Sequence, residues 1–491
     1  MTTDSATAHA WTALGGAPAL ADRITYTPAG EVLPARLPVR QLARATVGVC
    51  SLAAAELAAR RGGGAIPAVR VDEGAVATAF ISERHLRVDG RRPTSFAPLS
   101  GFWRAADGWV RTHANYPHHR ARLLTALGLP EHAEPDTLAA ELAQRPAREI
   151  QETAYAADAL AVAVVPPGEL PLRTVPLVES WEAGNEGAGA WRCPDPVQPL
   201  RKPLPTVDGA QPPRTAEPHP DRSRADLRAR SLPAEAHPFG ALASAPAAGV
   251  RVLDLTRVIA GPVATRTLAL LGADVLRVDS PHLPEDPDAH ADTGFGKRST
   301  RLDLADPHDR RTFDELLAQA DVVVTAYRPG ALDRFLTHHP GLIVAQLNAW
   351  GWTGPWAARR GFDSLVQAGT GIALTEASAD GRPGALPAQA LDHGTGYLLA
   401  AAVLRALTDR ADGGGARHLR FSLAGTASWL LHGITPTPPG PGTYAPERHL
   451  TERPSPTGHL HYALPPIAYP DAPRDWSRPP GPWGTDAPTW V

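Results

Sequence analysis

The feature that most constrains the fold is a strand–helix–strand pattern in residues 249–279. Residues 250–255 have the composition of a strand, residues 263–271 show the apolar spacing of a helix, and residues 273–278 give a second strand pattern. Two strands joined by a helix run parallel, because the helix brings the chain back to the end of the sheet at which the first strand began. Gly272 closes the helix, at a position where glycine readily takes a left-handed conformation. We therefore expect a βαβ unit that begins a parallel sheet.

More patterns of this kind follow along the chain. A helix is expected at residues 310–318, and strands are expected at residues 321–325 and 342–347. Alternating strands and helices are typical of an α/β fold. The predicted fold class is α/β, with an open, Rossmann-like parallel sheet, helices on both of its faces, and a small α+β domain beside it.

The small α+β domain is expected in residues 99–195. Its hairpin, residues 102–110, turns at Asp107-Gly108, a strong turn dipeptide between two apolar runs. Helices are expected at residues 118–127, 136–142 and 147–157, and a strand at residues 161–165.

An internal repeat links the first part of the chain to the last. The aligned segments are residues 37–48 and 386–396. Each is followed by an Ala/Leu-rich helix, a triple glycine and a short strand, and features recurring in order indicate two copies of one unit. When Gly48 is aligned with Gly396, Arg44 stands opposite Asp392. Any chemistry that depends on Asp392 is therefore expected only in the second copy.

These patterns divide the chain into five predicted segments. They are residues 1–98, a degenerate copy of the unit around Asp392; 99–195, the small α+β domain; 196–247, a linker rich in Pro, Ala and Arg; 248–434, the Rossmann-like domain; and 435–491, a proline-rich tail.

Composition excludes several classes of partner. The formal net charge is −3 over 491 residues, which gives no reason to expect nucleic acid or a membrane surface as a partner. Cys50 and Cys193 are too few for a disulfide framework or a thiolate metal site. The start lacks the pattern of a signal peptide, and no apolar run is expected to span a bilayer. A soluble, cytoplasmic protein is expected.

The common cofactor and metal motifs do not occur. The turn after the first strand is Ala-Gly-Pro at residues 260–262, so the G-x-G-x-x-G cradle for a dinucleotide pyrophosphate is missing. There is no P-loop and no nucleophile elbow. The histidine pairs at residues 118–119 and 338–339 lack partners at chelating spacing and are expected on the surface. No metal is expected.

Asp392 has two interpretations from its local sequence. It precedes a strongly periodic helix, where free N–H groups and the helix dipole favour an ionised carboxylate, and the glycines at 394 and 396 would let a ligand approach. An accessible, ionised carboxylate can serve as a nucleophile. An ordinary N-cap aspartate has the same local pattern.

Many short motifs in residues 249–434 resemble the family III CoA-transferases, the group of formyl-CoA transferase and carnitine CoA-transferase. In family order, the matching stretches are residues 252–262, 271–279, 296–299, 320–324, 328–334, 354–355 and 361–368, followed by Asp392 with its helix. So many motifs in order are more specific than any one of them. Residues 99–165 resemble the small domain of the family more loosely.

The resemblance implies an enzyme that moves CoA from an acyl-CoA thioester to a carboxylic acid, with no metal. Asp392 falls on the family's nucleophilic aspartate, which forms a covalent aspartyl-CoA thioester. Asp363 falls on a second acidic residue, which could tune the site or orient its groups. Contacts with CoA are implied for Lys297, Arg298, Tyr327, Arg334 and Arg360, and the guanidinium groups among them suit phosphate oxygens.

The chain also departs from the family pattern. Pro281 stands where formyl-CoA transferase has a CoA-contacting arginine, and Ile259 replaces its active-site glutamine. Two alternatives therefore stay open, an acyl-CoA racemase and a non-catalytic CoA-binding protein. A racemase of this fold would need a histidine at the position of Phe362 to act opposite Asp392.

The family forms interlocked dimers, and the resemblance implies either a homodimer or an intrachain pseudo-dimer here. In the second arrangement, the helix of the first copy, residues 49–59, would pack where the helix of a partner subunit packs.

Overall fold

The computed structural model describes residues 4–94, 96–169, 176–182, 245–327, 339 and 341–491. Within them, seven strands form one large sheet. Their order is β10 (Arg298–Arg301), β9 (Asp274–Asp279), β8 (Arg251–Leu255), β11 (Val322–Thr325), β12 (Ile343–Asn348), β13 (Arg417–Ser422) and β7 (Glu179–Glu182). Neighbouring strands pair in parallel, except that β7 runs antiparallel to β13.

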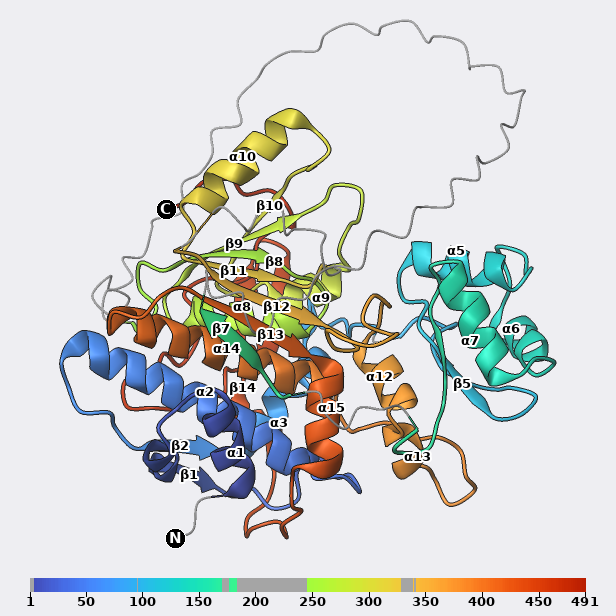
Figure 1. Cartoon of the computed structure of the whole chain (residues 1–491), viewed down its shortest axis with the longest axis horizontal. Coiled ribbons are helices and arrows are strands. Elements are labelled where there is room, and N and C mark those ends of the chain that lie inside the picture. Colours follow the sequence, from blue (N-terminus) through green and yellow to red (C-terminus); the bar gives the residue numbers. More distant parts are fainter. Residues whose placement is uncertain (1–3, 95, 170–175, 183–244, 328–338, 340) are drawn as a thin grey trace, which may run out of the picture.

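Helices cover both faces of this sheet (Figure 1). Helices α8 (Ala260–Leu270), α14 (Ala390–Ala411) and α15 (Leu423–His432) pack against its strands on one face, and α10 (Pro307–Ala318) covers the other. The remaining described helices of this part of the chain are α9 (Pro287–Thr293), α12 (Asp363–Gly369) and α13 (Ile372–Thr375). Successive strand residues separate into two cores. Val252 packs in the core shared with α8 and α14, whereas Leu253 packs in the core shared with Phe313 of α10. This alternation is the one that a strand buried on both faces requires, and the predicted α/β fold class is confirmed.

The βαβ unit forms close to its predicted bounds, with β8, α8 and β9 in the expected order. Gly272 has the expected left-handed conformation, with φ of 96°. The expected turn at residues 260–262 is wrong, because these residues form the first turn of α8. A proline is tolerated there, since the first N–H groups of a helix have no partner within the helix. Strands β10 and β7 were not predicted.

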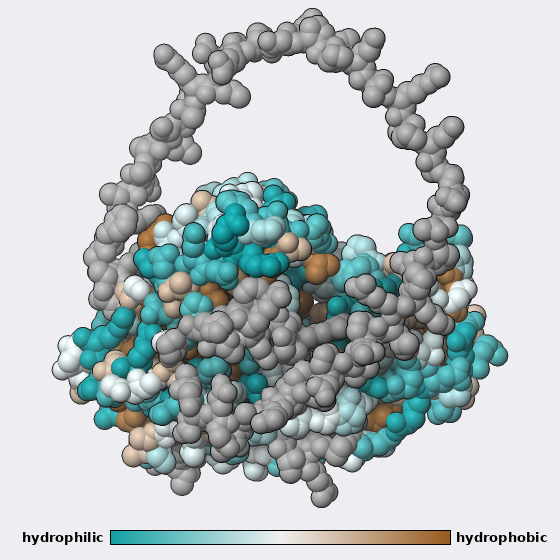
Figure 2. All heavy atoms as spheres, turned by 45° about the horizontal axis from the view of Figure 1, so that its top comes forward, coloured by the Kyte–Doolittle hydropathy of each residue, from teal (hydrophilic) through white to brown (hydrophobic). Residues whose placement is uncertain are grey.

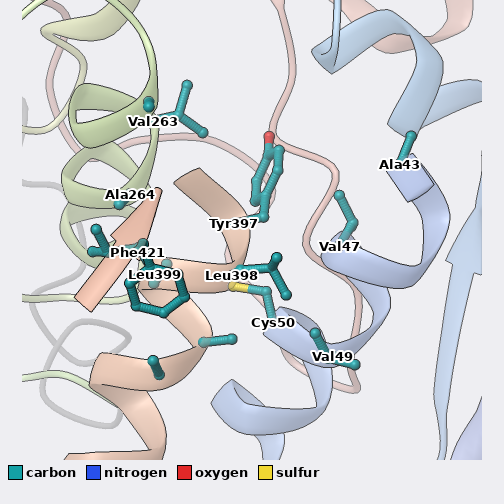
Figure 3. Packing of buried hydrophobic residues seen from close by; sticks show 14 of the residues in the cluster. Ala43, Val47, Val49, Cys50, Val263, Ala264, Tyr397, Leu398, Leu399 and Phe421 are labelled. Carbon is teal, nitrogen blue, oxygen red and sulfur yellow. The ribbon is translucent and has the colours of Figure 1, made fainter. Parts of the chain in front are cut away.

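The N-terminal segment joins the core of the large sheet. Its elements are α1 (Ser5–Ala13), η1 (Pro18–Arg23), β1 (Ile24–Thr27), α2 (Val39–Gly62), β2 (Val69–Asp72), α3 (Glu73–Ala79), α4 (Ser82–His85) and β3 (Arg87–Val88). Helix α2 lies along α14, and α8 packs on the other side of α14 (Figure 3). Cys50 of α2 and Tyr397 of α14 are among the fully buried side chains of this packing.

Helix α2 is also long and apolar enough, by length and composition, to cross a membrane, which the sequence analysis did not expect of any run. This helix is mostly inside the protein, because 78% of its apolar stretch is buried. The apolar composition of α2 is thus explained by its central position between α14 and the strands β1 and β2.

The two segments aligned by the repeat have the same order of elements. Strand β2 and helix α3 follow α2, just as β13 and α15 follow α14. Strands β1 and β2 pair in parallel, as β12 and β13 do. At the position of Asp392, Arg44 of α2 forms an ion pair with the buried carboxylate of Glu73 at 2.8 Å. Duplication remains a prediction, consistent with this arrangement.

The small unit lies apart from the large sheet in Figure 1. It consists of β4 (Phe102–Arg104), β5 (Trp109–Thr112), α5 (Pro117–Ala126), α6 (Pro135–Leu142), α7 (Ala147–Ala156) and β6 (Ala161–Ala163), with its own hydrophobic core. The predicted hairpin forms as β4 and β5, which pair antiparallel. Most of the predicted linker at residues 196–247 lies outside the described residues.

The C-terminal tail is packed on the rest of the chain. Its elements are η2 (Pro446–His449), β14 (Leu450–Ser455) and β15 (Gly458–Ala463), and β15 also pairs with β3 of the N-terminal segment. Tryptophan indoles of the tail donate hydrogen bonds to Arg266 O (from Trp476, 2.8 Å), Asp279 Oδ2 (from Trp483, 2.8 Å) and Leu316 O (from Trp490, 3.1 Å). On the face shown in Figure 2, hydrophobic residues of the described chain are scattered among hydrophilic ones.

Candidate active site

Asp392 and Asp363, the two predicted catalytic residues, lie together at the start of α14. Asp392 is in the first turn of α14, and Asp363 is the first residue of α12. Asp363 Oδ2 accepts hydrogen bonds from the main-chain N–H groups of Leu391 (2.9 Å) and Asp392 (3.0 Å). These N–H groups have no partner within the helix, so Asp363 caps α14 from outside. Tertiary structure brings the two aspartates together.

The Asp363 carboxylate is held by a further side chain. Its Oδ1 accepts a hydrogen bond from Nε2 of Gln367, one turn later in α12. The orientation of the Gln367 amide is fixed in turn, because its Oε1 accepts the N–H of Leu386 at 2.9 Å. The donors to Asp363 in the described part of the chain are therefore all N–H groups, and the carboxylate acts as an acceptor on both oxygens.

Asp392 does not cap its own helix. The N-cap of α14 is Gln389, and no side-chain cap hydrogen bond is made there. Among the described residues, no hydrogen bond to the carboxylate oxygens of Asp392 is found, although only 7% of this residue is exposed. The interpretation of Asp392 as an ordinary N-cap aspartate is thus wrong. Asp392 is buried, and its carboxylate makes no hydrogen bond to the described residues, whereas the side chain of an N-cap aspartate would accept one from the helix main chain.

Burial controls the charge of both aspartates. It raises the pKa of Asp363 to about 6, against the hydrogen bonds from Gln367 and the α14 main chain, which favour the charged form. Burial also raises the pKa of Asp392 well above its usual range, and the carboxylates of Asp363 and Glu83 add to this effect. The expected ionised state of Asp392 is therefore not favoured by its surroundings, because burial and like charges outweigh the helix terminus.

The glycines that follow Asp392 are inside α14 and serve helix packing. A Cβ on Gly394 would lie 2.8 Å from Leu42 Cδ2 of α2. A Cβ on Gly396 would lie 2.6 Å from the carbonyl oxygen of Ala260 and 2.9 Å from Val263 Cβ, both of α8. These glycines thus admit neighbouring helices on two sides, rather than the ligand that the sequence analysis expected there.

Lys297 and Arg298, two of the predicted CoA contacts, have partners within the protein. Lys297 is 3% exposed, and its Nζ lies 3.0 Å from both Asp254 Oδ2 and the carbonyl oxygen of Pro262. Arg298 binds both carboxylate oxygens of Asp274 at 2.8 and 3.0 Å. A contact of either cation with CoA would require these pairs to open.

The remaining predicted CoA contacts are Tyr327, Arg334 and Arg360. Tyr327 follows β11 and is 42% exposed, at the carboxyl ends of the parallel strands, where open α/β sheets bind ligands. Arg334 lies outside the described residues. Arg360 precedes α12 and lines a cavity of about 390 Å³ together with Tyr155 of α7. Its carbonyl oxygen accepts a hydrogen bond from the Tyr155 hydroxyl at 3.0 Å.

Sequence reasoning missed several residues around the aspartates. Glu83 of α4 lies near His393 and Asp392, and it belongs to no motif. His113 stacks on Phe362 with ring centroids 3.7 Å apart and an angle of 4° between the rings. His119, expected on the surface, is buried next to His113. Only the folded chain brings these residues together, since they come from separate elements. Among the described residues, no cluster of His, Cys, Asp and Glu could hold a metal ion.

Comparison with known proteins adds to this geometry. The family described as CoA-transferase family III matches residues 247–469, which include the large sheet from β8 onward, Asp363 and Asp392. Residues 247–469, the part that this family matches, are called the family III region below. The match confirms the resemblance on which the prediction of the two aspartates was based.

Relatives of this chain carry several CoA-transferase names. The chain is 37% identical over 202 residues to acetyl-coenzyme A transferase nodX of Hypoxylon pulicicidum, and the match covers 38% of this chain and 34% of that protein. It is 34% identical over 180 residues to formyl-CoA:oxalate CoA-transferase of Streptomyces coelicolor, covering 33% and 44% of the two chains. The chain thus spans about a third to a half of the length of the curated relatives that it matches.

A solved structure of the hypothetical protein Rv3272 from Mycobacterium tuberculosis is also similar. The sequence identity is 33%, the match covers 38% of this chain and 57% of that one, and the TM-score is 0.36. The crystal structure of a CAIB/BAIF family protein from Brucella suis matches with 28% sequence identity and a TM-score of 0.36. This match covers 44% of this chain and 65% of that one.

Proposed function

We propose that this protein transfers CoA from an acyl-CoA thioester to a carboxylic acid, with Asp392 as the nucleophile. The observation that carries this proposal is the state of the Asp392 carboxylate. It is buried, it makes no hydrogen bond to the described residues, and Asp363 binds the main-chain N–H of the same residue at 3.0 Å. A group that stabilised the fold would be paired, whereas a nucleophile must keep its oxygens free for the substrate.

The proposed reaction consists of four displacements, each of which forms and breaks one bond. The Asp392 carboxylate attacks the thioester carbonyl carbon, the C–S bond breaks, and a mixed anhydride and CoA thiolate result. The thiolate then attacks the aspartyl carbonyl carbon, which releases the donor carboxylate and leaves an aspartyl-CoA thioester. The acceptor carboxylate repeats the first displacement on this thioester. The returning thiolate finally forms the new acyl-CoA and frees Asp392. Starting from the ionised carboxylate, no proton is gained or lost in the four steps, so any proton that Asp392 carries must leave before the first of them.

Asp363 has a positioning role in this proposal. By accepting the N–H groups of Leu391 and Asp392, it fixes the main chain from which the nucleophile projects. Its own carboxylate is fully buried, so it acts on the reaction through Asp392 rather than on the substrate. Correct placement of a nucleophile lowers the entropy that the reaction must lose. For CoA itself, Tyr327, Arg334 and Arg360 stay the proposed contacts.

The covalent intermediate can be tested by intact mass spectrometry. The protein is mixed with a panel of acyl-CoA thioesters and quenched with hydroxylamine, which converts an aspartyl thioester into a hydroxamate. We expect a hydroxamate that maps to Asp392 and is absent from Asp392→Asn. Asp412→Asn, at the other end of α14, is the matched control and should keep the adduct. A hydroxamate that persists in Asp392→Asn would refute Asp392 as the nucleophile.

One observation favours keeping the racemase as a second candidate. Position 362 holds phenylalanine, but the imidazole of His113 stacks directly on that ring. Burial, with a smaller effect of Arg111, lowers the pKa of His113 to about 3, so its imidazole is neutral but a weak base, and it could take the α-proton only if substrate binding raised that pKa. Incorporation of deuterium from D₂O at the acyl α-carbon, lost in His113→Gln, would support a racemase. Hydroxamate formation without deuterium incorporation would support the transferase.

We also propose that the chain is an intrachain pseudo-dimer in which α2 takes the place of the helix of a partner subunit. This is supported by the close packing of α2 on α14 and by the partly buried ion pair between Glu56 and Arg405, 2.6 Å apart. Sedimentation equilibrium should then give the mass of one chain. A stable dimer that dissociates only on unfolding would contradict the pseudo-dimer.

A further inference from the structure

An open cavity of about 490 Å³ lies between the N-terminal segment and the C-terminal tail. Residues of β2 and α3 line it from the N-terminal segment, and residues between His449 and Arg474 line it from the tail. Its lining includes no residue of α12 or α14, so it is separate from the site around Asp392. Its volume falls within the range of pockets that bind small organic molecules, about 300–1,000 Å³.

Contacts with the rest of the chain fix the tail wall of this cavity. The N–H of Ala468 donates to Ser51 Oγ of α2 at 3.1 Å, and the N–H of Leu464 donates to the carbonyl oxygen of His449 at 2.8 Å. Ile467 is 6% exposed and belongs to the main hydrophobic core. Three of the tail residues in the lining are prolines, whose φ is restricted. The cavity is therefore formed before a ligand binds, which lowers the entropic cost of binding.

The lining combines an apolar surface with positive charge. Leucine, isoleucine, tyrosine, proline and alanine side chains supply the apolar part. Its ionisable basic residues are Arg70, His449 and Arg474, and no aspartate or glutamate is among the described residues that line it. Within the described part of the chain, neither arginine forms an ion pair, and Arg70 donates its Nε–H to Thr27 Oγ1 at 2.9 Å. The terminal guanidinium nitrogens of both arginines are thus free to bind an anion.

Acidic side chains close to this cavity in sequence do not neutralise the two arginines. Asp72 accepts the N–H groups of Gly74 at 2.7 Å and Ala75 at 3.0 Å, and so caps α3. Its Oδ1 also lies 3.6 Å from His449 Nε2, so a protonated His449 would be paired with it. Asp471 belongs to the same part of the tail but does not line the cavity. The two guanidinium groups therefore make the lining complementary to a negatively charged ligand.

We propose that this cavity binds the carboxylate form of an acid with an apolar body, such as a medium-chain fatty acid, at a site separate from Asp392. Arg70 and Arg474 hold the carboxylate, because guanidinium and carboxylate groups form paired hydrogen bonds. The aliphatic chain lies on the apolar lining, which removes its surface from water. The N-terminal segment thus holds a ligand of its own, whether or not the chain transfers CoA.

Isothermal titration calorimetry of the full chain with decanoate, below its micelle-forming concentration, tests this site. We expect decanoate to bind, and 1-decanol, which has the same chain without the charge, to bind about tenfold more weakly. Arg70→Gln combined with Arg474→Gln should weaken decanoate binding about tenfold and leave decanol binding unchanged. Arg92→Gln combined with Arg311→Gln is the matched control, because it removes the same charge from exposed positions outside the lining, and it should leave decanoate binding unchanged.

A third variant tests where decanoate binds. Ala68 is exposed and lines the cavity, so the indole of Ala68→Trp can fill the cavity without disturbing the core, and decanoate binding should be lost. Decanoate binding that persists in Ala68→Trp would place the ligand elsewhere and overturn the proposal, as would an absence of binding to the wild-type chain. If the arginine variant does not fold, Ala68→Trp and the comparison with decanol decide. No acyl-CoA is used, so the result is independent of the hydroxamate experiment.

Discussion

Replacement of Asp363 should loosen the start of α14 and thus the main chain that carries the nucleophile. In Asp363→Ala, the N–H groups of Leu391 and Asp392 lose the acceptor that they bind at 2.9 and 3.0 Å. A hydrogen bond to a charged group stabilises a protein by about 1.5–3 kcal/mol. Each of these two amides should therefore lose about that much protection, and because 1.4 kcal/mol corresponds to a factor of ten, each should exchange its hydrogen about 10–100 times faster.

Hydrogen exchange followed by mass spectrometry measures this change locally. A peptide that covers residues 388–396 should exchange faster in Asp363→Ala, whereas one from the C-terminal half of α14 should not. Asp306→Ala is the matched control, because Asp306 accepts the N–H groups of His308 (2.7 Å) and Asp309 (3.1 Å) at the start of α10. It should loosen α10 and leave α14 unchanged. Unchanged exchange at residues 388–396 in folded Asp363→Ala would refute the capping role of Asp363.

Two further substitutions test the packing and the buried charge of the family III region. In Gly396→Ala, the new Cβ would lie 2.6 Å from the carbonyl oxygen of Ala260, so urea unfolding should show a free energy of unfolding lower by about 1–3 kcal/mol. Gly415→Ala is the control and should be nearly neutral, because the space around its Cβ is open. Equal stability of the two variants would contradict the close contact of α8 and α14. Lys297→Met leaves the buried Asp254 carboxylate without its cation. Thermal unfolding without CoA should therefore show a free energy of unfolding lower by about 3–5 kcal/mol. Arg311→Met, at an exposed position, is the control and should change the stability little. Unchanged stability of Lys297→Met together with weaker CoA binding would instead support a direct contact with CoA.

Several features of the fold could be predicted because they depend on local sequence. The strand and helix patterns around Gly272 predict β8, α8 and β9, since periodicity and a residue that tolerates positive φ act over a few positions. The order of short motifs identified the family III region and, within it, Asp363 and Asp392. The close approach of helices at Gly394 and Gly396 was not predicted, because glycine permits either a ligand or a neighbouring helix beside it.

The chemistry of the site depends on residues that are distant in sequence. Local reasoning expected an ionised Asp392, but burial and the carboxylates of Asp363 and Glu83 raise its pKa. Lys297 was expected to contact CoA, yet its ammonium faces Asp254. The charge of a buried group reflects its desolvation and the sum of the charges around it. The sequence by itself determined the succession of β8, α8 and β9 and the identity of the acidic residues. Only the tertiary structure decided which groups surround them, because those groups come from separate elements that meet when the core forms.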